Sequence, residues 1–148
     1  EPFLVNCGTY AYQCAHRHWF RSTEAHNTVQ IDGVEQSETW STFRLARRSI
    51  TSVLELSENG ISMELTDYKG NRIRREIRLT ADALYIKDQA DGQKLRSYLH
   101  STHQIDINSS AELIRSEAKY APEYGLLQTI QQITAIGKGR IELRIPLN

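Results

Sequence analysis

The stretch Arg21–Gly33, RSTEAHNTVQIDG, leads from a polar loop into a short strand. Apolar and polar residues alternate over Thr28–Asp32, which is the pattern of a β-strand, and Gly33 ends the run. The loop side of this junction carries His26 and Asn27. A rigid element holds a functional side chain at its edge better than a free loop does, although any strand-opening turn has the same pattern. His26 and Asn27 are therefore the first candidates for a site.

The chain keeps a β pattern on both sides of this stretch. Turn signals such as Glu58-Asn59-Gly60 and Lys69-Gly70-Asn71 separate short segments rich in alternating apolar residues. The expected strands are Phe3–Val5, Thr28–Asp32, Trp40–Arg47, Ile50–Ser57, Ile61–Thr66, Arg72–Thr80, Ala83–Ala90, Leu95–His100, Ala111–Ser116 and Ile141–Leu147. Leu126–Thr134 fits neither the helical nor the strand period, and Ala118–Gly125 is expected to be a loop.

Nine or ten short strands without a long amphipathic helix predict an all-β protein, an antiparallel β-sandwich of roughly ten strands. One face of each strand is expected to be packed and the other wet. Neither a repeat nor a low-complexity linker interrupts the chain, so we expect residues 1–148 to form a single domain.

Charge and hydropathy exclude several classes of protein. The 18 basic and 18 acidic residues cancel, so the strong field typical of a nucleic-acid-binding protein is absent. No apolar run reaches the roughly 20 residues that span a bilayer, and no signal-peptide pattern is present. Because the chain starts at Glu1 without an initiator Met, we expect it to be a fragment of a larger chain.

Two cysteines, Cys7 and Cys14, lie in the N-terminal loop region. A disulfide is compatible with their spacing in an oxidising compartment, and two free thiols are equally compatible. Neither belongs to a CxxC pair, so a cysteine-rich zinc site is not indicated.

Two N-terminal stretches, EPFLVNCGTYAYQ and HWFRSTEAHNTVQIDGVEQS, resemble the signature of the heparinase II/III-like polysaccharide lyases in order and spacing. The well-matched part is Glu1–Gln36. The resemblance implies the C-terminal β-sandwich (supersandwich-like) portion of a bacterial, periplasmic or secreted enzyme. Its N-terminal helical toroid would be missing from this chain, and the active site would lie between the two domains.

Lyases of this kind cleave uronate-containing acidic polysaccharides, such as glycosaminoglycans, by β-elimination. The substrate carboxylate must be neutralised, a base must remove the adjacent carbon-bound proton, and an acid must protonate the departing oxygen. Because the resemblance places a catalytic Tyr on the missing toroid, and a His-rich segment upstream of Glu1, we expect the fragment alone to be inactive.

By the same resemblance, the His of the AHNT motif binds a metal, usually zinc, and corresponds to His26. Its aspartate partner corresponds to Asn6, which as a neutral amide is a weaker ligand than a carboxylate. Zinc binding is therefore expected to be weakened or lost, unless the thiolate of Cys7, which replaces a usual Pro, compensates. The alternative is that His26 caps or hydrogen-bonds the loop.

The resemblance also points to a catalytic Tyr in the intervening loop, with Tyr12 favoured over Tyr10; both could instead be packing residues. Arg21 matches the arginine of the family motif and could grip a carboxylate, or form a structural ion pair. A rival hypothesis is a non-catalytic carbohydrate-binding sandwich that stacks Trp19, Tyr10 and Tyr12 on sugar rings. A third is a structural module that supports the missing domain and exposes a large apolar surface.

Other polar residues are expected to be structural or solvent-exposed. They are His16 and His18 in the N-terminal loop, the row Arg72, Arg74 and Arg78 on one strand, and His100 and His103.

Overall fold

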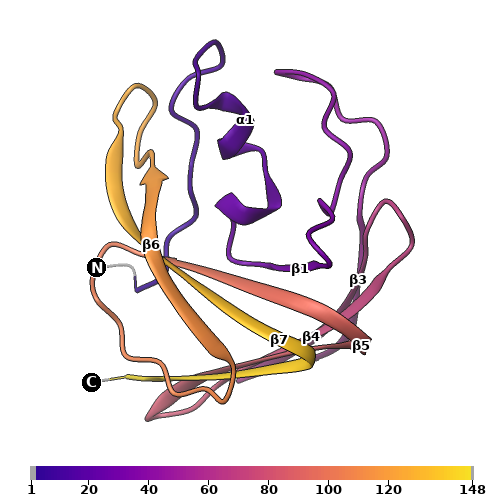
Figure 1. Cartoon of the computed structure of the whole chain (residues 1–148). Helices are drawn as coiled ribbons and strands as arrows, with labels where there is room; N and C mark the ends of the chain where they lie inside the picture. Colours follow the sequence, from indigo (N-terminus) through magenta and orange to yellow (C-terminus); the bar gives the residue numbers. More distant parts are fainter. Residues whose placement is uncertain (1–2, 148) are drawn as a thin grey trace.

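The structure is a computed structural model that describes residues 3–147. It is built from antiparallel strands, with short helical turns only near the N-terminus (Figure 1). The elements are helix α1 (Arg17–Phe20), 3-10 turn η1 (Thr23–Ala25), and strands β1 (Val29–Ile31), β2 (Ile50–Ser57), β3 (Gly60–Thr66), β4 (Arg72–Leu79), β5 (Ala83–Ser101), β6 (Glu112–Tyr120) and β7 (Gln128–Pro146). In the described part of the chain, no helix is long and apolar enough to cross a membrane.

The strands form one sheet in the order β2-β3-β4-β5-β7-β6, and β1 also pairs with β5. The two 19-residue strands, β5 and β7, run antiparallel along its centre. Their register shifts between Gln89 and Lys94, next to Gly92 and Gly139, which both have positive φ. This bulge divides the sheet in two. We call the part formed by β1, β6, residues 94–101 of β5 and residues 131–138 of β7 the site half.

A continuous apolar core covers one face of the sheet across both halves. It includes Ile73 of β4, Ile86 and Leu99 of β5, and Ile133 and Leu143 of β7, all at most 4% exposed. Ile86 and Leu99 differ in parity along β5, so the bulge shifts which residues face the core.

The opposite face of the site half is covered by the N-terminal segment, with α1, η1 and the loop after β1 above the sheet (Figure 1). Gln132 of β7 donates to the carbonyl of Glu24, and Trp19 packs edge-on against His100 of β5. Every residue of β1 is buried as a result. The parts of the site half formed by β1, β5 and β7 are therefore mostly buried or half-buried on both faces, while most of the edge strand β6 stays exposed. This cover positions the AHNT loop.

The predicted fold class is confirmed, but the sheet has seven strands rather than about ten. Ala83–Ala90 and Leu95–His100 are parts of one strand because the bulge at Gly92 bends the chain without ending the ladder. Leu126–Thr134 and Ile141–Leu147 likewise belong mainly to β7, and β6 continues to Tyr120.

Two expected strands are absent from the structure. Trp40–Arg47 has only one isolated bridge, Thr39 to Leu45, because its apolar side chains find no sheet to pack against. Phe3–Val5 makes a single backbone bond to the ladder, from the Val5 N–H to the His100 carbonyl at 3.0 Å. Both stretches have strand-like composition, but neither forms a ladder with a strand of the sheet, and composition alone does not provide such a partner.

Two hairpin turns illustrate how the sequence signals work. Asp32 and Gly33 both have positive φ and join β1 to Val34 through an Ile31–Val34 bridge, as expected for an Asp-Gly turn. The β2–β3 hairpin is also confirmed. However, Gly60 pairs with Ser57, so the loop is Glu58-Asn59, and neither Asn59 nor Gly60 has a positive φ.

Candidate functional site

A pocket of about 500 Å³ opens between α1, the N-terminal loop and the segment after β1. Its lining brings together three of the residues singled out in the sequence, Asn6, Arg21 and His26. Arg17 and Glu35 also line it. The Glu35 carboxylate is already engaged, since it accepts hydrogen bonds from the backbone N–H and hydroxyl of Thr23 at 2.6 and 2.8 Å. The pocket thus presents an imidazole, an amide and two guanidinium groups.

His26 and Asn6 are in direct contact although 20 positions separate them. The Asn6 Oδ1 atom lies 2.7 Å from His26 Nδ1 and also accepts the Cys7 backbone N–H at 2.9 Å. An amide oxygen only accepts, so His26 Nδ1 donates to it and Nε2 carries no proton. Burial lowers the pKa of His26, with opposing contributions from Glu35 and the Phe20 carbonyl. The imidazole is therefore neutral at neutral pH.

The thiol of Cys7 faces the same ring nitrogen, with Sγ 3.7 Å from His26 Nδ1. Cys7 is fully buried, and burial raises the pKa of its thiol to about 11. Both Cys7 and Cys14 are free thiols. This geometry leaves Cys7 protonated at neutral pH unless a cation stabilises its thiolate.

These donors fit part of a zinc shell. Bond lengths of about 2.3 Å to sulfur and 2.0–2.1 Å to nitrogen place two tetrahedral ligands about 3.6 Å apart, close to the Cys7–His26 separation of 3.7 Å. The 2.7 Å between Asn6 and His26 is instead a hydrogen-bond distance. Within residues 3–147, no group of three or more His, Cys, Asp or Glu side chains could hold a metal ion.

Asn27 fixes the AHNT loop on the sheet, a role that the sequence did not reveal. Its side-chain nitrogen donates to the Val5 carbonyl at 3.1 Å, and its Oδ1 accepts the His100 backbone N–H at 2.8 Å. Its own carbonyl accepts a 2.9 Å hydrogen bond from Arg75. Arg75 is itself held by the buried Asp88 at 2.6 and 2.7 Å. A charged residue on an apolar strand face, Arg75, was the only signal in the sequence for this network.

His100 is buried beneath the loop. Its Nδ1 lies 3.1 Å from Asn27 Oδ1, and its Nε2 is the one buried side-chain nitrogen or oxygen without a partner among residues 3–147. Burial, with a smaller contribution from His26, lowers the pKa of His100 to about 4.

Arg21 and Arg17 use part of their donor capacity on backbone carbonyls of the loop after β1. Arg21 donates from Nη1 to the Ser41 carbonyl and from Nη2 to the Arg44 carbonyl. Arg17 donates from Nε to the Thr42 carbonyl at 3.2 Å. A guanidinium carries five N–H groups, so both arginines keep donors that can face the pocket. Of the two alternatives for Arg21, the structural ion pair is not formed among the described residues, and carbonyl contacts take its place.

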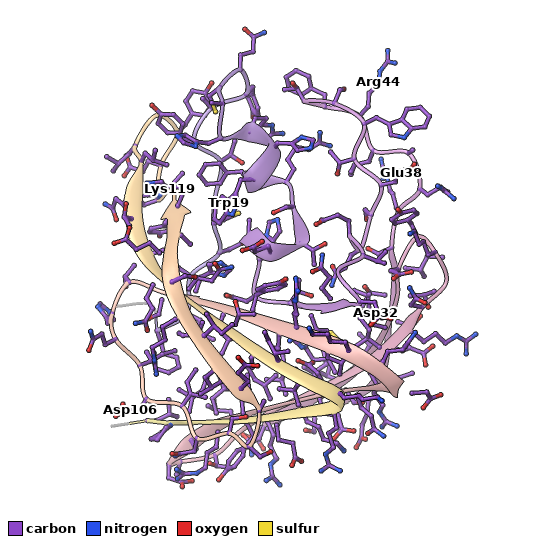
Figure 2. All side chains as sticks on the ribbon, viewed as in Figure 1. Trp19, Asp32, Glu38, Arg44, Asp106 and Lys119 are labelled. Carbon is purple, nitrogen blue, oxygen red and sulfur yellow. The ribbon has the colours of Figure 1, made fainter. Side chains whose placement is uncertain are left out.

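The three aromatic candidates lie in different environments in the structure. Tyr12 is 48% exposed, at the rim beyond the pocket. Tyr10 is half-buried and packs with Cys7 and Phe20. Trp19 lies inside, between α1 and β6 (Figure 2), with Phe20 edge-on at 5.1 Å. Trp19 and Tyr10 therefore do not form an exposed surface with Tyr12.

The remaining candidates lie elsewhere. The exposed arginines of β4 are engaged on the wet face of the sheet, Arg74 with Glu76 at 3.3 Å and Arg78 over the Tyr85 ring. His18 is exposed, and His16 stacks edge-on to Tyr10 at 6.5 Å. None of these four residues lines the candidate pocket.

Comparisons with known proteins agree with the fold. Heparinase III, the BT4657 gene product, superposes with a TM-score of 0.70 at 14% identity, over 98% of this chain and 28% of that chain. The heparan sulfate lyase HepC from Pedobacter heparinus superposes with a TM-score of 0.68 at 14% identity, over 99% of this chain and 28% of that one. At this identity the superpositions show a shared fold, and the chain spans about a quarter of the length of these structures.

A search of curated proteins found no match. The model of the family "Heparinase II/III-like, C-terminal" matches residues 1–143, nearly the whole chain. The chain therefore belongs to the heparinase II/III-like C-terminal domain family.

Proposed function

We propose that this chain forms the β-sandwich wall of the active site of a polysaccharide lyase that cleaves a uronate-containing acidic polysaccharide by β-elimination. The observation that carries the proposal is that Asn6, Arg21 and His26 line one pocket in a member of this family. The N-terminal helical domain that would complete the cleft is not part of the chain.

The side chains supply parts of the elimination chemistry. Arg21 offers guanidinium donors that would neutralise the substrate carboxylate and so acidify the neighbouring C–H. His26 is neutral with an unprotonated Nε2, the state required of a group that accepts a proton or a hydrogen bond. Tyr12, exposed at the rim, would exchange a proton with the sugar from its hydroxyl. The catalytic groups of the missing domain would complete the set, so we propose that the 148-residue chain alone is inactive.

We also propose that zinc, when bound, is held by His26 together with Cys7 and a ligand from outside the described residues. Zinc at this position would brace the wall of the site and add positive charge next to the substrate carboxylate. Because the Cys7–His26 pair would bind the metal through Nδ1, that nitrogen could no longer donate to Asn6 Oδ1, which would keep the Cys7 backbone N–H. In this zinc-bound state His26 would act as a ligand and not as a proton acceptor.

The test is ultraviolet absorbance of the full-length parent protein mixed with a panel of uronate polysaccharides. Elimination creates a conjugated double bond that hydrolysis does not, so absorbance rises with the true substrate. His26→Ala and Tyr12→Phe should each lower the rate by about 100-fold or more, the scale of lost acid–base catalysis. A flat trace from a folded parent, or full activity in the 148-residue chain alone, would contradict the proposal.

A second candidate function is a non-catalytic glycan-binding module. It is favoured by one observation, the amide of Asn6 where the family resemblance expects a carboxylate. This function predicts that the parent binds the glycan without any rise in absorbance, and that binding survives the loss of His26.

A further inference from the structure

Three aromatic side chains from distant parts of the chain meet beside the pocket, where Arg17 of the pocket lining lies over one of them. Tyr12 is the central ring, with its centroid 5.6 Å from Phe43 and 5.6 Å from Tyr124. Their exposed fractions are 48%, 66% and 66%. Large aromatic rings are rarely left in water as a cluster unless the surface has a partner. We call this group the aromatic rim.

Backbone contacts fix the aromatic rim in place. Arg17 and Arg21 of the α1 region donate to carbonyls on either side of Phe43, as described above. The Tyr124 loop is attached to the N-terminal loop by the hydrogen bond from Gly125 N–H to the Tyr10 carbonyl at 2.8 Å. A surface ordered in advance loses less conformational entropy when it binds a ligand.

The aromatic rim is continuous with the positively charged part of the pocket. Arg17 lies over the Tyr12 ring at 5.3 Å and also lines the pocket with Arg21. Arg44, the residue after Phe43 on the same loop, projects outward (Figure 2). A ligand in contact with both surfaces must therefore combine negative charge with apolar faces.

An acidic glycan has this combination, since its carboxylates or sulfates are anionic while the C–H faces of its sugar rings stack on aromatic rings. The plane of the Tyr12 ring makes an angle of 51° with that of Phe43 and 49° with that of Tyr124, so the three rings do not lie in one plane. Successive sugars of a glycan are rotated against each other in a similar way. The geometry suits an oligosaccharide better than a single flat ligand.

We propose that Tyr12, Phe43 and Tyr124 form a sugar-stacking subsite that binds residues of an acidic glycan extending beyond the Arg17–Arg21 pocket. The proposal rests on the proposed function for its ligand class. It assigns Phe43 and Tyr124 to binding alone, so their variants separate binding from chemistry.

The experiment is calorimetric titration of the 148-residue chain with hexasaccharides from heparan sulfate, hyaluronan and alginate. Phe43→Ala and Tyr124→Ala should each weaken binding of the best hexasaccharide by about threefold to tenfold, the scale of one aromatic contact. Phe43→Trp should restore it. The matched control is Trp40→Ala, because Trp40 is on the same loop and 65% exposed but hydrogen-bonds to Glu38 instead.

Equal affinities for the wild type and for Phe43→Ala and Tyr124→Ala, or no hexasaccharide bound at millimolar concentration, would overturn the subsite. In the latter case the aromatic rim is a contact for another protein segment. The two proposals can fail separately, because this titration needs no turnover. If binding depends on the aromatic residues but the parent has no lyase activity, the subsite proposal stands and the lyase proposal fails. If the parent is a lyase but binding does not depend on these residues, only the lyase proposal stands.

Discussion

At the scale of single residues, His26 and Asn27 are neighbours with different tasks. His26 faces the pocket, while Asn27 joins the AHNT loop to Val5, Arg75 and His100. The motif made both residues candidates, and the family resemblance placed Asn6 next to His26. The partners of Asn27 could not be predicted, because Arg75 and His100 lie 48 and 73 positions away and no local pattern links them.

Cys7 allows the first residue-scale prediction. Addition of Co²⁺ to the chain should produce a sulfur-to-cobalt charge-transfer band, with release of the thiol proton, if Cys7 and His26 ligate together. Cys7→Ser and His26→Ala should each abolish the band, and Cys14→Ser, the matched control, should keep it. Cobalt binding without such a band, strengthened by Asn6→Asp, would show that position 6 rather than Cys7 supplies the second ligand.

His100 allows a second prediction, on pH. Its pKa is about 4 in the folded chain and near 6.5 when unfolded, so between these values only the unfolded chain takes up the proton. The free energy of unfolding should therefore fall as pH drops from 6.5 to 4, by on the order of 3 kcal/mol from this group. Above pH 6.5 His100 adds no pH dependence.

Denaturant titrations across this range measure the effect. In His100→Gln the free energy of unfolding should change less steeply with pH than in the wild type. The carboxylates contribute equally to both proteins, so the difference between the two pH curves isolates the contribution of His100. His18→Gln, at an exposed position, should follow the wild type. Parallel curves for His100→Gln and the wild type would show that the buried imidazole does not govern this dependence.

At the scale of elements, strand composition predicted β2, β3 and β4 almost to the residue, because turns with clear signals bound each of them. The same reasoning predicted two separate segments in place of β5 and two in place of β7, with each break at a glycine. A positive-φ glycine can end a strand or form a bulge within it, and only the neighbouring strand decides which. The ladder partner that decides it here lies about 50 positions away in sequence.

The ion pair between β4 and β5 supports a prediction at this scale. Arg75 binds both oxygens of Asp88, also donates to Ser97, and its side chain is only 8% exposed. Asp88→Ala should cost about 3–5 kcal/mol, because it leaves a buried charge without its partner. The double variant Arg75→Met/Asp88→Leu should recover most of that loss in chemical denaturation, since it removes both charges.

This ion pair is expected to affect the candidate site as well as stability. Even when stability recovers, the double variant lacks the bond from Arg75 to the Asn27 carbonyl. Its His26 NMR resonances should therefore shift or broaden. As a control, Arg144→Ala removes the exposed pair with Asp82 and should leave both stability and the His26 signals nearly unchanged. A double variant as unstable as Asp88→Ala would contradict the electrostatic explanation.

At the scale of the whole molecule, alternation of apolar residues predicted the all-β class, since each strand needs one packed face. It did not predict that β1 and the neighbouring parts of β5 and β7 would be covered on both faces, because the cover comes from loops and short helical turns without a periodic pattern. The aromatic rim was missed for the same reason. Phe43 was assigned to a strand, Tyr124 to a loop and Tyr12 to catalysis, and only the folded chain brings them together.

The edge of the sheet supports the last prediction. Strand β2 pairs only with β3 along the sheet order, and all eight of its residues are exposed. Val53 and Leu56 are 60% and 74% exposed, so an edge with free backbone groups also carries apolar side chains. We expect the 148-residue chain to self-associate through this edge, and the double variant Val53→Lys/Leu56→Lys to lower the association constant by about tenfold or more in sedimentation velocity. The matched control is Ile114→Lys on β6, at the opposite edge of the sheet. A chain that stays monomeric over the whole concentration series would contradict this prediction and would show that the register shift at Leu54 protects β2 from pairing.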